Sequence, residues 1–118
     1  MRTRHIQHTF NGKEIVALQE DGVIVTNARE FHDLIFNLPS DRIVLYKENI
    51  DESFFDLRTG FAGEILQETL SHSKKLGIIG DYSRYASRSL NAFISEGGDE
   101  TQIVFADSLD EALRKLSA

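Results

Sequence analysis

The chain has 118 residues, the usual size of one domain, and its 41% hydrophobic and 27% charged residues are ordinary for a globular protein with a single core. Its net charge of −6 argues against a general nucleic-acid-binding protein, which needs a basic surface to neutralise phosphates. The absence of cysteine excludes disulfides, thiolate metal sites and thiol catalysis, and no apolar run approaches the ~20 residues that span a membrane.

The first predicted elements form a β-hairpin. Residues 4–10 and 13–19 have the pattern of strands, and Asn11-Gly12 between them is a strong signal for a two-residue turn, because both residues tolerate positive φ. A short apolar piece at 23–25 is a candidate third strand. The hairpin leaves an exposed strand edge, so dimerisation by strand pairing stays open, although nothing in the sequence specifies it.

The rest of the chain alternates helices with strands. Asn27, with Glu30 three residues later, indicates a capping box that opens the first helix. Then come a strand at 42–46, a helix beginning between 54 and 60, a strand at 75–80, a helix over about 82–94, a strand at 102–106 and a helix from Ser108. Such alternation implies right-handed crossovers and parallel strands. We therefore predict a single α/β domain over residues 1–118, with a mixed, mostly parallel sheet, an N-terminal antiparallel hairpin and about four helices.

Polar residues follow two of the predicted parallel strands and precede the second helix. Ligands and partners of open α/β sheets meet the loops at the carboxyl ends of the strands, and the unpaired N–H groups at a helix N-terminus favour an anion. If the strands at 42–46 and 75–80 are neighbours, these polar segments form one rim. The residues predicted to bind there are Glu48, Asn49, Asp56, Arg58, Thr59, Gly60, Asp81, Ser83 and Arg84.

Several of these residues also have an ordinary structural interpretation. Thr59 is first of all a natural helix cap, and the same holds for Asp56 and Asp81. Arg58 can pair with Asp56 or Glu52. The rim is therefore a hypothesis about how separate segments converge.

Catalytic and metal-binding templates fit the sequence poorly. His5 and His8 are three residues apart on a predicted strand and point to opposite faces, whereas His32 and His72 are interpreted as isolated residues of two different helices. No G-x-S-x-G, G-x-x-x-x-G-K-[ST] or G-x-G-x-x-G motif is present. The sequence thus predicts no catalytic residue, no metal site and no cofactor.

The stretch FFDLRTGFAGEIL at 54–66 resembles the motif that opens the second helix of STAS domains, the anti-sigma factor antagonist fold of bacterial regulators. That family has an apolar-Asp-Ser-Ser/Thr-Gly motif there, and in many members a partner kinase phosphorylates its hydroxyl and so switches a protein–protein interaction. Asp56 matches the acid, and Thr59-Gly60 match the hydroxyl–glycine pair. Here one extra residue separates acid from hydroxyl, and Leu57-Arg58 replace the usual small hydroxyl residue.

The chain also resembles a group of small bacterial proteins of unknown function. Their patterns FFDL-x-TG-x-AGEILQ and GD-[FY]-S-x-Y-x-S-x-SL occur here at 54–67 and 80–90. This second resemblance supports the fold and implies no activity.

These resemblances favour a non-enzymatic bacterial signalling module that presents the N-terminus of its second helix to a protein partner, with Thr59 as a candidate phosphorylation site. The alternative is a small anionic ligand at the same site, for which Arg58 and Arg84 would be planar donors. A hydrolase or transferase using Asp56 or Asp81 as base is less favoured. Neither nucleic acid nor membrane is an expected partner. No secretory signal follows the basic first residues, so a cytoplasmic location is expected.

Overall fold

A five-stranded mixed sheet forms the centre of the molecule. The computed structural model describes residues 4–81 and 103–117. The strands are β1 (His5–Phe10), β2 (Lys13–Leu18), β3 (Arg42–Tyr46), β4 (Lys75–Ile79) and β5 (Ile103–Ala106), and they lie in the order β1-β2-β3-β4-β5. The first pair is antiparallel and the other pairs are parallel. Asn11 and Gly12 both have positive φ in the hairpin turn. The predicted mixed sheet with its N-terminal hairpin is confirmed.

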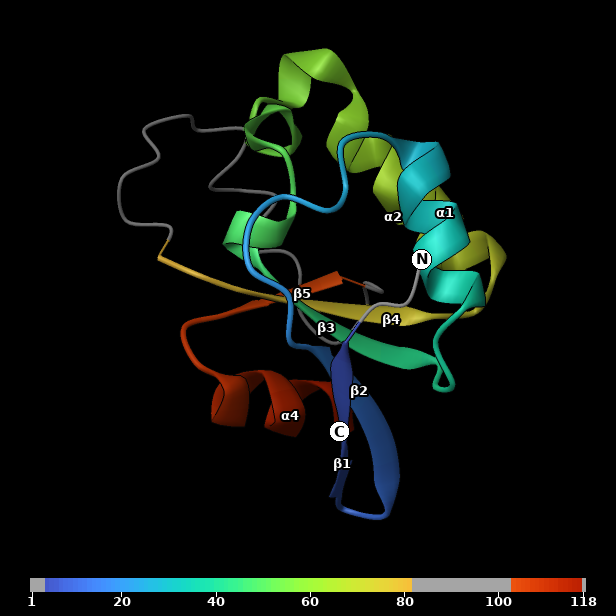
Figure 1. Cartoon of the computed structure of the whole chain (residues 1–118), viewed down its shortest axis with the longest axis vertical. Coiled ribbons are helices and arrows are strands. Elements are labelled where there is room, and N and C mark those ends of the chain that lie inside the picture. Colours follow the sequence, from blue (N-terminus) through green and yellow to red (C-terminus); the bar gives the residue numbers. More distant parts are fainter. Residues whose placement is uncertain (1–3, 82–102, 118) are drawn as a thin grey trace.

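Helices cover both faces of this sheet. The described residues form three, α1 (Ala28–Phe36), α2 (Phe61–Ser71) and α4 (Leu109–Ser117), and the helix predicted over about 82–94 lies outside them. In Figure 1, α1 and α2 lie over one face and α4 lies over the other. None of the described helices combines the length and apolar character needed to cross a bilayer.

The two faces of the sheet are buried by alternate residues of each strand, as the period of two in a strand requires. Ile43 and Leu45 of β3 point into the core under α1 and α2, whereas Val44 between them packs toward α4. Gly77 of β4 also faces α4, and a Cβ there would lie 3.0 Å from Cδ1 of Leu116. The absence of a side chain at Gly77 therefore allows α4 to approach the sheet closely.

The connection from β3 to α2 is a series of 3₁₀ turns, η1 (Lys47–Asn49), η2 (Glu52–Phe55) and η3 (Leu57–Thr59). Phe54 and Phe55 in η2 are buried and tie this connection to the core. The strand predicted at 23–25 is reduced to a single parallel bridge between Val25 and Ile50.

Candidate functional site

Asn49, a predicted rim residue, lies in the interior and has a structural role. Its side-chain amide donates to the carbonyls of Glu20 (2.8 Å) and Gly22 (2.9 Å), while its side-chain oxygen accepts from the Tyr46 amide (3.0 Å). The residue is fully buried. Asn49 therefore fastens the β2–α1 connection to the end of β3 instead of facing outward.

Two other predicted rim residues, Glu48 and Asp81, line a common hollow. Because β3 and β4 are neighbours, the turns after them enclose a hollow of about 640 Å³. We call it the acidic hollow, and its lining residues are Val23, Tyr46, Lys47, Glu48, Ile50, Asp51, Glu52, Ile79, Gly80 and Asp81. The predicted Ser83 and Arg84 lie outside the described residues.

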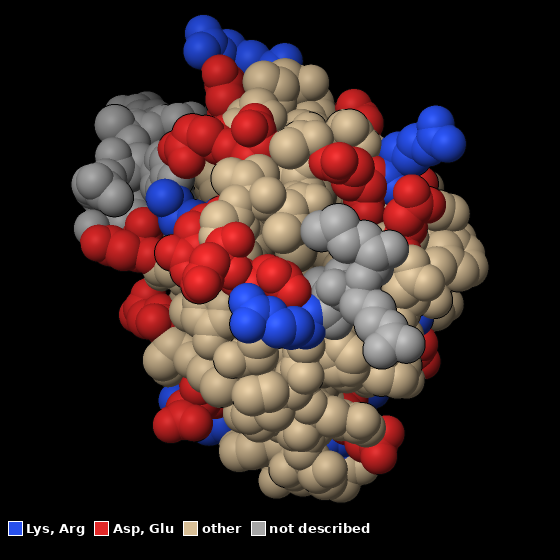
Figure 2. Space-filling view, in the orientation of Figure 1, with Lys and Arg blue, Asp and Glu red and all other residues tan. Residues whose placement is uncertain are grey.

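The electrostatics of the acidic hollow oppose a small anionic ligand. Among the described residues, four carboxylates and one lysine line it. Acidic side chains also gather on this side of the molecule, over the β2–α1 connection and the turns that follow β3 (Figure 2). Like charges repel, so the described lining suits a cationic or hydrogen-bonding surface better than a phosphate.

The predicted residues Asp56 and Arg58 are not part of the hollow's lining but form an ion pair of their own. Nε of Arg58 donates to Oδ1 of Asp56 at 2.9 Å and Nη2 donates to Oδ2 at 2.8 Å. The side-chain hydrogen bond from Arg58 holds the pKa of the Asp56 carboxyl below its ordinary value. The Arg58 side chain is 90% exposed, so the pair projects from the surface just before α2.

Thr59 and Gly60 form the turn that opens α2. Gly60 occupies the N-cap position with φ of 77°, a left-handed conformation that glycine adopts at little cost. The Thr59 hydroxyl accepts from the Phe61 amide at 3.2 Å and lies 2.8 Å from the carbonyls of both Ser53 and Asp56, to which it donates. The predicted capping role is thus shared: Gly60 takes the cap position, and Thr59 supplies the side-chain bond.

The structure corrects the interpretation of His32 and His72 as isolated residues. Nδ1 of His32 in α1 lies 2.8 Å from Oε2 of Glu68 in α2, and Nε2 of His72 lies 3.3 Å from the same oxygen. We call these three residues the His–Glu–His cluster. The hydrogen bond from His32 lowers the pKa of the Glu68 carboxyl. The spacing of Glu68 and His72 was a visible signal, since residues four apart share a helix face.

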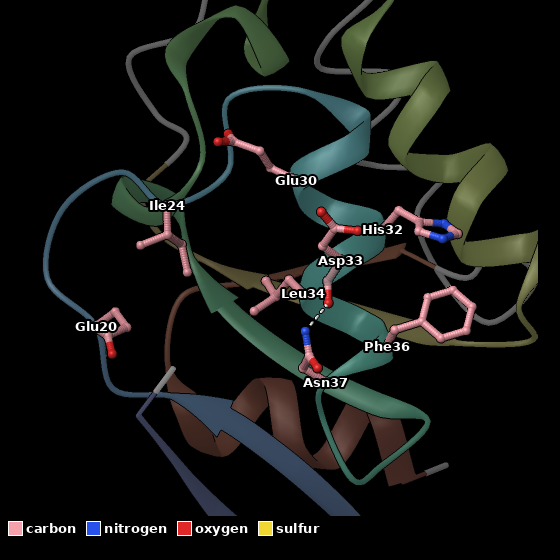
Figure 3. Close-up of a pocket in the computed structure, with 8 residues that line it drawn as sticks. All are labelled: Glu20, Ile24, Glu30, His32, Asp33, Leu34, Phe36 and Asn37. Atoms are coloured by element: carbon pink, nitrogen blue, oxygen red, sulfur yellow. Dashed lines mark hydrogen bonds between the residues drawn. The ribbon is translucent and has the colours of Figure 1, made fainter. Parts of the chain in front are cut away.

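Phe36 completes this contact between the helices. Its ring centroid lies 4.5 Å from that of His32 and 5.0 Å from that of His72, and the two imidazoles are 5.0 Å apart. Figure 3 shows His32 and Phe36 on the same side of α1, directed away from Ile24 and Glu20. The rings therefore meet on the α2 side of the helix.

His32 also borders a second hollow, between α1 and the β2–α1 connection. This α1 pocket has a volume of about 580 Å³, and its lining residues are Glu20, Ile24, Glu30, His32, Asp33, Leu34, Phe36 and Asn37 (Figure 3). Two of the lining side chains already form hydrogen bonds with backbone groups close to them in the sequence. The Glu30 carboxylate accepts from the Thr26 amide at 2.7 Å and the Asn37 side chain donates to the Asp33 carbonyl at 2.7 Å.

A mixed sheet covered by helices on both faces, with an acid and a Thr-Gly step before the second helix, is consistent with a STAS-like fold. The chain is similar in structure to a candidate anti-sigma factor antagonist from Thermotoga maritima, with a TM-score of 0.53 and 16% identity over 97% of this chain and 95% of that one. Residues 10–116 match the family described as a domain of unknown function, DUF4180, and the chain belongs to this family. No curated protein matches it. The predicted STAS-like fold is confirmed.

Proposed function

We propose that this protein is a non-enzymatic regulatory module that binds a protein partner. The observation that carries the proposal is its STAS-like fold, which it shares along nearly its whole length with a protein described as a candidate antagonist of an anti-sigma factor. Such an antagonist acts on another protein. The polar segment at 56–60, which resembles the regulatory motif of STAS domains apart from one extra residue, lies on the surface before α2.

The proposed contact surface combines segment 56–60 with the acidic hollow. The two are continuous along the chain, because Glu52 of η2 lines the hollow and Asp56 caps the end of the same turn. Carboxylates predominate among the described residues that line the hollow. The matching surface of a partner is therefore basic, and complementary charge raises the association rate in a salt-dependent way.

Thr59 is the position at which modification would switch this surface. Its hydroxyl donates to the carbonyls of Ser53 and Asp56, so a phosphate would remove a donor that closes the turn. The phosphate group would also add a charge of about −1.5 to −2 close to Asp56. Arg58 is the adjacent basic residue that could pair with it. We expect phosphorylation to open the turn and redirect Arg58 from Asp56 to the phosphate.

Quantitative affinity capture from host lysate tests the proposal. The bait proteins are wild type, Arg58→Ala, the charge reversal Glu48→Lys, and Arg29→Ala as a matched control at an exposed arginine of α1. We expect one protein to be enriched by wild type and by Arg29→Ala, and to be depleted at least about tenfold by Glu48→Lys, a loss of about 1.4 kcal/mol in binding. Arg58→Ala should change the enrichment, because it leaves Asp56 without its ion-pair partner. Mass spectrometry of the bait reports modification of Thr59.

The purified partner then allows direct titration. Its affinity should fall as salt rises, and Thr59→Glu should change the affinity, whereas Thr59→Ser, which keeps the hydroxyl, should not. Equal enrichment by all four baits would contradict the proposed surface. A salt-independent affinity would contradict its electrostatic basis.

A further inference from the structure

The His–Glu–His cluster brings three metal-ligating side chains together from two helices. One ligand atom from each of His32, Glu68 and His72 lies within 4.8 Å of the other two. Both imidazole nitrogens are directed at the same carboxylate oxygen, at 2.8 and 3.3 Å. The cluster is not part of the proposed partner surface, because it lies at the C-terminal end of α2, an 11-residue helix of roughly 16 Å, whereas segment 56–60 precedes its first turn.

We propose that this cluster binds a divalent transition-metal ion of the Zn²⁺ type. Two imidazoles and one carboxylate are a donor set that suits Zn²⁺ and related first-row ions. Three protein ligands also leave a coordination position open for water or for a side chain of another molecule. The ion would join α1 to α2 by metal–ligand bonds.

The distances in the cluster fit such an ion. Ligand atoms about 2.0–2.1 Å from a tetrahedral metal are about 3.4 Å from one another. The separation between Nε2 of His72 and Oε2 of Glu68 is already 3.3 Å. The Nδ1–Oε2 pair of His32 and Glu68, at 2.8 Å, would have to open by about 0.6 Å, and the ligand atoms of the three residues all lie within 4.8 Å of one another.

Burial and charge also favour a cation at this position. The side chains of His32, Glu68 and His72 are 39%, 30% and 29% exposed, so an ion can enter from solvent and is then partly shielded from it. In the described part of the chain, Glu68 contacts the two histidines and pairs with no lysine or arginine. Among the described residues, no permanently charged side chain therefore neutralises this carboxylate.

The aromatic contacts hold the two imidazoles close to a binding geometry. Phe36 lies one helical turn after His32 and packs against both histidine rings. Glu68 and His72 are likewise one turn apart at the end of α2. The packing of α1 on α2 therefore already restricts the ligand side chains, so less conformational entropy is lost when an ion binds.

Zinc titration of the tag-free full chain, after treatment with a chelator, tests the site. Isothermal titration calorimetry should show one Zn²⁺ per chain, and the thermal midpoint should rise with Zn²⁺ concentration. In His32→Gln and His72→Gln, glutamine keeps an N–H donor for Glu68 but removes the imidazole. We expect each variant to weaken Zn²⁺ binding by more than about 100-fold, since even outer-shell changes cost 10–100-fold.

Two further variants make the result decisive. His5→Gln, on β1, should bind Zn²⁺ like wild type. Glu68→Gln should lose Zn²⁺ binding, because glutamine has the shape of glutamate but no carboxylate. Glu68→Gln also serves as the test if a histidine variant fails to fold. Lack of Zn²⁺ binding by wild type would overturn the proposal. Equal binding by wild type and the His32, His72 and Glu68 variants would also overturn it, as would an equal loss in His5→Gln.

Discussion

The two ends of α2 are stabilised in different ways. At its N-terminal end, the hydrogen bonds of Asp56, Arg58 and Thr59 join residues at most six positions apart. At its C-terminal end, Glu68 bonds to His32, 36 positions earlier in the chain. The first network can form within one short segment, whereas the second exists only when α1 and α2 are packed together.

The local network before α2 can therefore rearrange by itself, whereas the contact between His32 and Glu68 depends on the packing of α1 on α2. A local, exposed network can be rearranged by a partner or a modification without moving the core. A contact between two helices changes only if their packing changes or if something binds between them. The following experiments test this contrast in order of expected effect.

The largest effect should come from the buried residue beneath the N-terminal network. Phe54 is fully buried and packs against Phe55 and Phe61, with ring centroids 4.9 and 6.0 Å away. We expect Phe54→Ala to lower the free energy of unfolding by about 3–5 kcal/mol, because it leaves a cavity. Phe36→Ala, at a ring that is 62% exposed near the C-terminal end, should cost less than about 1 kcal/mol. Urea unfolding measures both, and equal losses would contradict the contrast.

An intermediate effect is expected from the glycine that opens α2. Gly60 has φ of 77°, so Gly60→Ala should cost about 1–2 kcal/mol from backbone strain, since no atom of the described residues lies within 4 Å of the added Cβ. Gly63 also has open space around it but lies inside the helix. Gly63→Ala should therefore stabilise the chain by about 0.5–1 kcal/mol. Thermal unfolding of the two variants should show shifts of opposite sign, and shifts of the same sign would refute the argument.

The smallest effect should be the pH-dependent coupling of Asp56 and Arg58. Because the hydrogen bond from Arg58 lowers the pKa of Asp56 in the folded state, the pair stabilises the fold above the ordinary Asp pKa of about 3.9. This stabilisation is lost as the pH falls through the lowered pKa. A double-mutant cycle with Asp56→Asn and Arg58→Ala should give a weak coupling at pH 7, because both groups are exposed, and a smaller coupling as the pH falls through the lowered pKa of Asp56. A coupling energy that does not decrease on acidification would contradict an ion pair between the two side chains.

Much of the fold could be predicted because its signals are local. The Asn11-Gly12 turn and the Asn27 cap each depend on residues within a few positions of one another. The cap differs in one detail, since the Glu30 carboxylate bonds to the Thr26 amide and not to that of Asn27. The ion pair of Asp56 with Arg58 was among the local options recognised from the sequence.

The burial of Asn49 and the His–Glu–His cluster could not be predicted in the same way. A polar residue after a strand has the same local sequence whether it faces solvent or fastens a distant loop, and the partners of Asn49 are carbonyls 27 and 29 positions away. Likewise, periodicity shows which face of α1 is apolar but not which residue of α2 meets His32. That pairing depends on the relative positions of α1 and α2 along the surface of the sheet.

The loop held by Asn49 separates the two hollows of the molecule. Val23 lines the acidic hollow, and its neighbour Ile24 lines the α1 pocket. The same short segment of the β2–α1 connection therefore borders both hollows. Hydrogen bonds to Asn49 hold this segment on both sides of Val23. Before Val23, the Asn49 side chain donates to the carbonyls of Glu20 and Gly22. After it, the amides of Ile24 and Val25 donate to the Asn49 carbonyl. A molecule bound in either hollow would therefore contact a loop segment whose next residue borders the other hollow.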